Sequence, residues 1–135
     1  MYTDRDLDTL VRTAYGECRN ESNDGIAAVA WVIRNRSNDS RWGKSIIDVC
    51  LQPLQFSCWN TSIPGRDAMM KASASPVYHK VLGICALVLA DQIPDPTDGA
   101  NHYYADYLDA KGKKPSWADD RKMTKRIGVH KFYKL

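Results

Sequence analysis

The spacing of apolar residues predicts four helices. Apolar side chains from Leu7 to Tyr15 recur every three or four positions, which predicts a first helix that ends near Glu17. A second, mostly apolar helix follows the N-cap residues at 22–24, and a short third helix near 45–51 is closed by a proline. A long apolar helix begins after Ser75-Pro76, because proline suits the first turn of a helix.

Two other parts of the chain lack a helical pattern. Residues 55–59 (Gln-Phe-Ser-Cys-Trp) alternate in character, which predicts a strand or hairpin. Residues 95–135 are rich in Tyr, Trp and Lys and show few clean helical faces. We find no repeat and no linker, so we expect one mainly helical α+β domain over residues 1–135, with a small β-hairpin region.

Composition and charge exclude several classes of protein. The chain is 44% hydrophobic and 26% charged, which is typical of a globular domain and unlike a disordered chain. Its 19 Lys and Arg against 16 Asp and Glu give a charge of +3, too small for a dedicated nucleic-acid binder. No apolar run is long enough to span a membrane. We therefore expect no nucleic-acid partner, no stable membrane insertion and a monomer.

The N-terminus and the cysteines indicate the compartment. Residues 1–10 carry acidic side chains and lack the apolar core of a signal peptide, which predicts that the chain starts in a cytosol. The four cysteines have no CxxC spacing, and free buried thiols are the rule in that compartment. If any pair lies close together, we expect Cys50 and Cys58.

Glutamate is scarce, and both copies are neighbours. Of the 16 acidic residues 14 are Asp, and the two Glu are Glu17 and Glu21. Glu17 ends the first predicted helix, where burial and the helix dipole would raise its pKa and keep it protonated as a general acid. The alternatives are a solvated acid at Glu17 and, at Glu21, an acid that stabilises the N-terminus of the next helix.

Polar and aromatic residues suggest a surface for sugars or peptides. In a strand, Gln55, Ser57 and Trp59 would share one face. The run His102-Tyr103-Tyr104 also suits such ligands, because rings stack on sugars and hydroxyls bind their polar groups. The alternative for both segments is ordinary packing against the core.

We expect neither a metal nor a cofactor. The three histidines have no ligand spacing, although His102, His130 and an aspartate could still hold zinc. No phosphate-binding or nucleotide-binding glycine motif occurs. The basic run at 111–114 is expected to be a solvated loop.

Four motifs, in order, resemble the spore-cortex-lytic (SleB/CwlJ-type) cell-wall hydrolases. They are Ala14-Tyr15-Gly16-Glu17-Cys18-Arg19-Asn20-Glu21-Ser22 with the helix through Asn35-Arg36, then 55–59, then 95–104, then 115–118 with 127–133. The sequence departs from the family pattern at four positions: Cys18 stands for Ala, Asn20 for Gly, Arg34 for an apolar residue and Asn101 for Thr.

The resemblance implies a lysozyme-superfamily fold that acts on peptidoglycan glycan strands with one catalytic acid, Glu17. Glu17 would protonate the bond between MurNAc and GlcNAc, and the C6 hydroxyl would then attack C1, giving a 1,6-anhydro product. A muramidase that uses water is the alternative, and it needs a second carboxylate, for which Glu21, Asp95 and Asp98 are candidates. The resemblance further implies these substrate-binding or supporting residues: Glu21, Gln55, Ser57, Trp59, His102, Tyr103, Tyr104 and Trp117.

The resemblance and the missing export signal together suggest a setting. We expect a bacteriophage endolysin that is made in the host bacterial cytoplasm and reaches the wall through a holin-type pore. A non-catalytic wall-binding module remains the competing interpretation.

Overall fold

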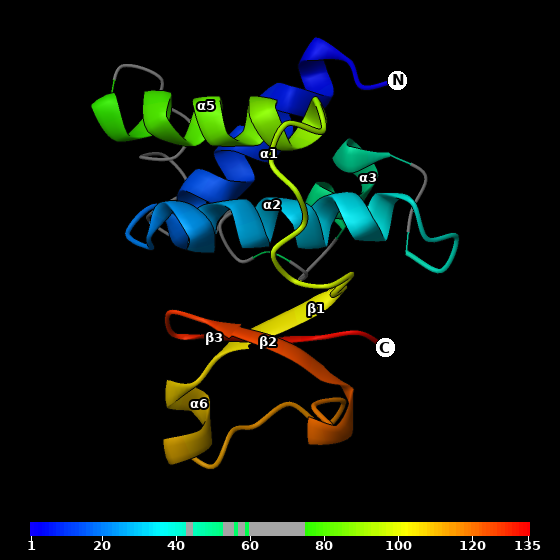
Figure 1. Ribbon diagram of the computed structural model, residues 1–135, viewed down its shortest axis with the longest axis vertical. Helices are drawn as coiled ribbons and strands as arrows, with labels where there is room; N and C mark the ends of the chain where they lie inside the picture. The colour runs from blue at the N-terminus through cyan, green and yellow to red at the C-terminus, as the bar shows by residue number, and fades with distance from the viewer. Residues whose placement is uncertain (43–44, 53–55, 57–58, 60–74) are drawn as a thin grey trace.

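The computed structural model describes residues 1–42, 45–52, 56, 59 and 75–135, and it places a layer of helices beside a small sheet (Figure 1). The helical layer contains α1 (Asp4–Cys18), α2 (Asn23–Ser37), α3 (Ile46–Leu51) and α5 (Pro76–Leu89). The second layer contains β1 (His102–Ala105), α6 (Tyr107–Ala110), the 3-10 helix η3 (Asp120–Lys122), β2 (Met123–Ile127) and β3 (His130–Tyr133). The mainly helical α+β class is as predicted.

The helices α1, α2, α3 and α5 each begin at a residue whose side chain caps the helix. Thr3 accepts a hydrogen bond from the Asp6 N–H, and Asp6 caps the Thr3 N–H in return. Ser22, Ser45 and Ser75 cap α2, α3 and α5 in the same way. Such caps satisfy N–H groups that have no partner inside the helix. The predicted helix starts are therefore confirmed.

The core forms around α2. Its small residues, among them Ala27 and Ala30, are buried and let α1, α3 and α5 pack closely on it. Arg34, which stands where the family pattern has an apolar residue, runs across the surface to the end of α5. There its guanidinium donates to the Val88 carbonyl at 2.8 Å and to Asp91 at 2.5 Å. The departure is accommodated because the charged group leaves the core.

The sheet is antiparallel, with strand order β1-β3-β2. Side chains alternate between its two faces. Tyr103 and Phe132 pack toward α2, against Ala28 and Val32. The opposite face carries a second cluster, made of Tyr104, Trp117, Ala118 and Tyr133 with Leu108 and Leu135.

The segment between α5 and β1 ties the two layers together. Asn35, near the end of α2, donates through Nδ2 to Asp95 Oδ2 at 3.0 Å and to the Ala100 carbonyl at 2.9 Å. Asp95 also accepts from Thr97 and from the Gly99 N–H. Arg36 Nε donates to the Asn101 carbonyl at 2.6 Å. The motif at 95–101 is therefore a hydrogen-bonded link between α2 and β1.

Two predictions about smaller features have different outcomes. Residues 56 and 59 do not lie in a strand. The Trp59 N–H donates to the Phe56 carbonyl at 3.1 Å, and Trp59 is in a 3-10 turn. The strand prediction is therefore wrong at these two residues. Gln55, Ser57 and Cys58 lie outside the described residues. Cys18, Cys50 and Cys85 are buried free thiols, as predicted. Within the described ranges no helix is long and apolar enough to cross a membrane.

Candidate active site

Glu17 lies in the last turn of α1 with its carboxyl group half-buried. Burial raises its pKa from the ordinary value of 4.5 to about 7. Among the residues that the structure describes, no hydrogen bond or ion pair to this carboxyl group is found. A carboxyl group in this state takes up and releases a proton near neutral pH, which is what a general acid and base requires.

Trp59 anchors the chain beside Glu17. Its indole N–H donates to Thr13 Oγ1 at 2.8 Å, and Thr13 lies one turn before Glu17 on α1. Thr13 is fully buried, and the Trp59 ring packs against the main core cluster. The polar edge of Trp59 is thus used inside the protein, which favours packing as its role.

Glu21 reaches from the corner between α1 and α2 toward the sheet. Its N–H donates to the Cys18 carbonyl at 2.9 Å, which closes the corner. Its Oε1 lies 3.9 Å from His130 Nδ1 on β3. His130 was not among the predicted site residues, although it lies inside the last motif of the family resemblance, and that membership was the signal for it.

The tyrosines of β1 point to opposite faces of the sheet. Tyr103 faces the helices, where its ring meets His130 edge-on with 5.0 Å between ring centroids. Tyr104 is buried on the other face, stacked on Tyr133 at 5.8 Å, and its hydroxyl donates to Asp109 at 2.8 Å. The two tyrosines therefore do not form one surface, and the contacts of Tyr104 favour the packing alternative.

His102 is held between two tryptophans. Its ring centroid lies 4.7 Å from that of Trp117 and 5.3 Å from that of Trp42. Burial, together with the charges of Arg36 and Arg41, lowers the pKa of His102 to about 4, so the ring is neutral at pH 7. Its Nδ1 lies 2.9 Å from Asn101 Oδ1. Trp42 was not predicted, because nothing in its local sequence indicates a contact with β1.

The two histidines considered for zinc are not brought together. His102 contacts Trp42 and Trp117, whereas His130 contacts Tyr103 and Phe132 on the helix-facing side. Across the described ranges, no group of three or more His, Cys, Asp or Glu is placed to hold a metal ion. We assign no residue as a metal ligand.

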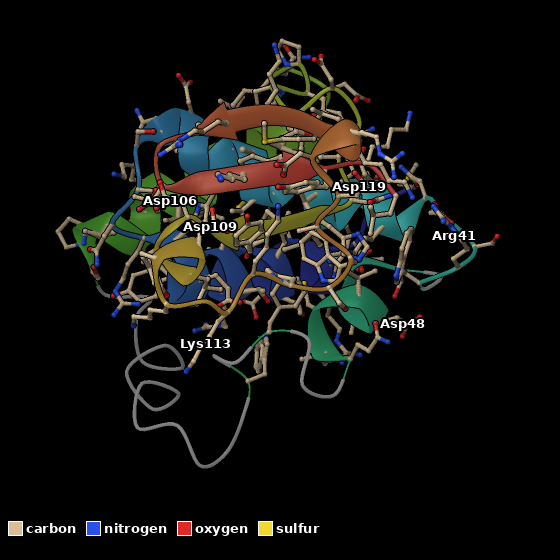
Figure 2. The ribbon with its side chains drawn as sticks, turned by 90° about the horizontal axis from the view of Figure 1, so that it is seen from below. Arg41, Asp48, Asp106, Asp109, Lys113 and Asp119 are labelled. Carbon is tan, nitrogen blue, oxygen red and sulfur yellow. The ribbon has the colours of Figure 1, made fainter. Side chains whose placement is uncertain are left out.

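Several basic residues on the sheet side are paired with acids. Figure 2, seen from that side, shows Asp106, Asp109 and Asp119 on the same surface as Lys113. The pairs include Lys114 with Asp120, Arg121 with Asp119, Arg126 with Asp106 and Lys131 with Asp109. Positive and negative groups alternate here, so this surface lacks the unbroken basic patch that binds nucleic acid.

The three carboxylates considered as partners of Glu17 each have other contacts. Asp95 accepts hydrogen bonds from Asn35, Thr97 and Gly99 in the link between α2 and β1. Asp98 is exposed and pairs with Lys125 at 3.6 Å, and Glu21 faces His130.

Comparison with known proteins places this chain in a family of cell wall hydrolases. Residues 20–133 match the family model described as Cell Wall Hydrolase, and the chain belongs to that family. Glu17 lies three positions before the matched range, so its assignment rests on the geometry and on the opening motif.

Two curated relatives have a more specific name than the family: both are spore cortex-lytic enzymes. The chain is 30% identical over 131 residues to a spore cortex-lytic enzyme of Halalkalibacterium halodurans, covering 97% of this chain and 35% of that protein. It is 26% identical over 133 residues to the spore cortex-lytic enzyme of Bacillus subtilis, covering 97% of this chain and 38% of that protein. The chain thus spans a little over a third of the length of these curated relatives.

Two solved structures share the fold. One is the catalytic domain of the germination-specific lytic transglycosylase SleB from Bacillus anthracis, with a TM-score of 0.76 and 24% identity over 98% of this chain and 97% of that chain. The other is the catalytic domain of the Bacillus cereus SleB protein, with a TM-score of 0.76 and 24% identity over 99% of this chain and 93% of that chain. These likenesses confirm the predicted architecture.

Proposed function

We propose that this protein degrades peptidoglycan as a lytic transglycosylase, with Glu17 as both acid and base. The observation that carries the proposal is the half-buried Glu17 carboxyl group, whose pKa of about 7 comes from burial. The membership in the cell wall hydrolase family supports the substrate, and the likeness to a structure titled as a lytic transglycosylase supports the reaction.

The reaction needs one carboxyl group. Protonated Glu17 donates its proton to the glycosidic oxygen between MurNAc and GlcNAc as the bond from C1 to that oxygen breaks. The C6 hydroxyl of the same MurNAc then forms a bond to C1, and its proton passes to the Glu17 carboxylate. The products are a 1,6-anhydro-muramoyl end and a free GlcNAc hydroxyl, and Glu17 is again protonated, without water being consumed.

The contacts of the other acids support this route over hydrolysis. A hydrolase that uses water needs a second carboxylate across the bond from the acid. Asp95 accepts hydrogen bonds within the segment before β1, Asp98 pairs with Lys125, and Glu21 faces His130. For the glycan itself we retain Gln55, Ser57 and Tyr103 as proposed contacts. We retain His102 and Trp117, which lie on the sheet face of Tyr104, as a second proposed contact region.

Mass spectrometry of digested peptidoglycan tests the reaction. We expect the protein to release fragments that end in 1,6-anhydro-muramic acid, and the Glu17→Gln variant to release none. Reducing MurNAc ends would assign a muramidase instead. Binding to peptidoglycan without release of any soluble fragment would assign a wall-binding module. Asp91→Asn, which removes one exposed carboxylate at a backbone φ of 59° that Asn also adopts, is the matched control.

We propose as a separate point that the protein acts in bacteriophage-mediated host lysis, from the host cytoplasm through a holin-type pore. The support is the family membership, because an enzyme of host lysis must degrade peptidoglycan. Expression in a host with and without a holin tests this, and lysis is expected only with the holin; equal lysis without it would contradict the setting.

A further inference from the structure

Glu21 and His130 come from distant parts of the chain and meet at one point. Glu21 lies at the corner between α1 and α2, and His130 begins β3. Glu21 Oε1 lies 3.9 Å from His130 Nδ1, and both side chains are largely withdrawn from solvent, with exposed fractions of 21% and 10%. This separation exceeds a normal hydrogen bond, and the carboxylate is a charge partner of the ring when His130 is protonated.

The surrounding backbone leaves room for Glu21 and for little else. A Cβ at Gly128, in the turn between β2 and β3, would lie 3.0 Å from Glu21 Oε1, and the residue has a φ of +58°. A Cβ at Gly25, in the first turn of α2, would lie 3.0 Å from Glu21 Cβ. Two glycines on different elements thus allow the close approach that brings Glu21 against the hairpin.

The ring of His130 has an unused polar atom on the side of Glu21. His130 Nδ1 is buried and has no hydrogen-bond partner in the part of the chain that the structure describes. Burial lowers the pKa of His130, and among the described residues the negative charges of Glu21 and Asp106 raise it by a smaller amount. The opposite edge of the ring packs on Tyr103 and Phe132, with centroids 5.0 and 6.2 Å away.

We propose that Glu21 and His130 form a positioning pair. The pair holds the corner after Glu17 against the turn between β2 and β3, and it also fixes Tyr103 against this turn. Glu17 lies in the last turn of α1, four residues before Glu21, so a shift of this corner moves the proposed acid relative to the sheet. Small displacements of a reacting group are costly in catalysis. The role in catalysis rests on the proposed function; the pairing itself does not.

Titration of His130 by NMR tests the pairing without any activity. The chain has three histidines, so the His130 signals can be assigned with a His130→Gln variant. Glu21→Gln removes the charge and keeps the shape, and the pKa of His130 should fall by about half a pH unit or more. Asp91→Asn removes a distant exposed carboxylate and should leave that pKa unchanged. An unchanged His130 pKa in Glu21→Gln would overturn the pairing.

Release of fragments and binding are then measured separately. We expect Glu21→Gln and His130→Gln each to slow the release of soluble fragments about tenfold, and the double variant to be no slower, because residues that act as one unit are not additive. Peptidoglycan pull-down, carried out in a Glu17→Gln background, should be unchanged. Additive losses, a full rate in Glu21→Gln or lost binding would each overturn the positioning role.

Two controls keep the outcomes distinct. Thermal unfolding of every variant identifies those that fail to fold, and if His130→Gln is one of them, the partly exposed Glu21→Gln decides alone. If the unmodified protein releases no fragments, the proposed function fails, and the NMR titration still decides whether the two side chains are paired.

Discussion

Glu17 in the helical layer and the paired aspartates of the sheet layer have opposite environments. In the helical layer, burial raises the pKa of Glu17 to about 7. In the sheet layer, the guanidinium and backbone N–H of Arg121 lower the pKa of Asp119 to about 2, and Lys131 lowers that of Asp109. The difference shows how a chain can pair many of the acids that the structure describes and still hold Glu17 ready to exchange a proton.

The largest expected effect is the loss of the proton donor. Glu17→Gln keeps the size of the side chain and removes the acid, and general acid catalysis contributes about a hundredfold to ten-thousandfold. We expect the release of soluble peptidoglycan fragments to fall about a thousandfold or more. Asp91→Asn, which also removes one carboxylate, should keep the full rate. Retained activity in Glu17→Gln would remove Glu17 from the mechanism.

The same variant should be more stable than the parent at alkaline pH. The pKa of Glu17 is higher in the folded protein than in the unfolded chain, so the folded state holds more protons between pH 4.5 and about 7 and loses stability as pH rises through that window. At pH 8 the charged, half-buried carboxylate costs at most about 3 kcal/mol of unfolding free energy.

Urea unfolding at two pH values measures this cost. Glu17→Gln should exceed the parent in stability at pH 8 and match it at pH 4. A difference that grows toward acid pH would contradict the raised pKa, because it would have the opposite sign.

The seam between the two layers is the next target. Asn35→Ala removes the two hydrogen bonds that Asn35 makes to the segment before β1 and leaves the buried Ala100 carbonyl without that donor. We expect a loss of about 2 kcal/mol in unfolding free energy. Asn38→Ala is the matched control, because Asn38 is exposed at the end of α2. Equal effects of the two changes would show that the hydrogen bonds of Asn35 do not hold the layers together.

The two layers also differ in how far the sequence predicts them. The caps at Ser22 and Ser75 and the apolar spacing act within a few residues, so the helices follow from local sequence. The strands are four or five residues long, and β1 pairs with β3 across a long intervening segment. Their pairing depends on contacts that no local pattern records, so only the loss of helical character could be read from 95–135.

The site divides in the same way. Glu17 could be predicted because it is scarce, ends a helix and lies in a motif. The contact of Glu21 with His130 and that of Trp42 with His102 could not, because each joins residues from separate elements. The uncertainty over Tyr104 has the same origin: the sequence leaves both a sugar contact and packing open for 102–104, and which face of β1 meets the helices depends on the partner strand.

The smallest effect tests whether Tyr104 belongs to the packing of the sheet layer. Tyr104→Phe keeps the ring that stacks on Tyr133 and removes the hydroxyl that donates to Asp109 at 2.8 Å. We expect about 1 kcal/mol less unfolding free energy and an unchanged rate of fragment release. Tyr107→Phe, at a ring that is 56% exposed, should change neither. A slower rate in Tyr104→Phe at unchanged stability would return Tyr104 to the substrate, and the sheet layer would then share in the chemistry that we assign to the helical layer.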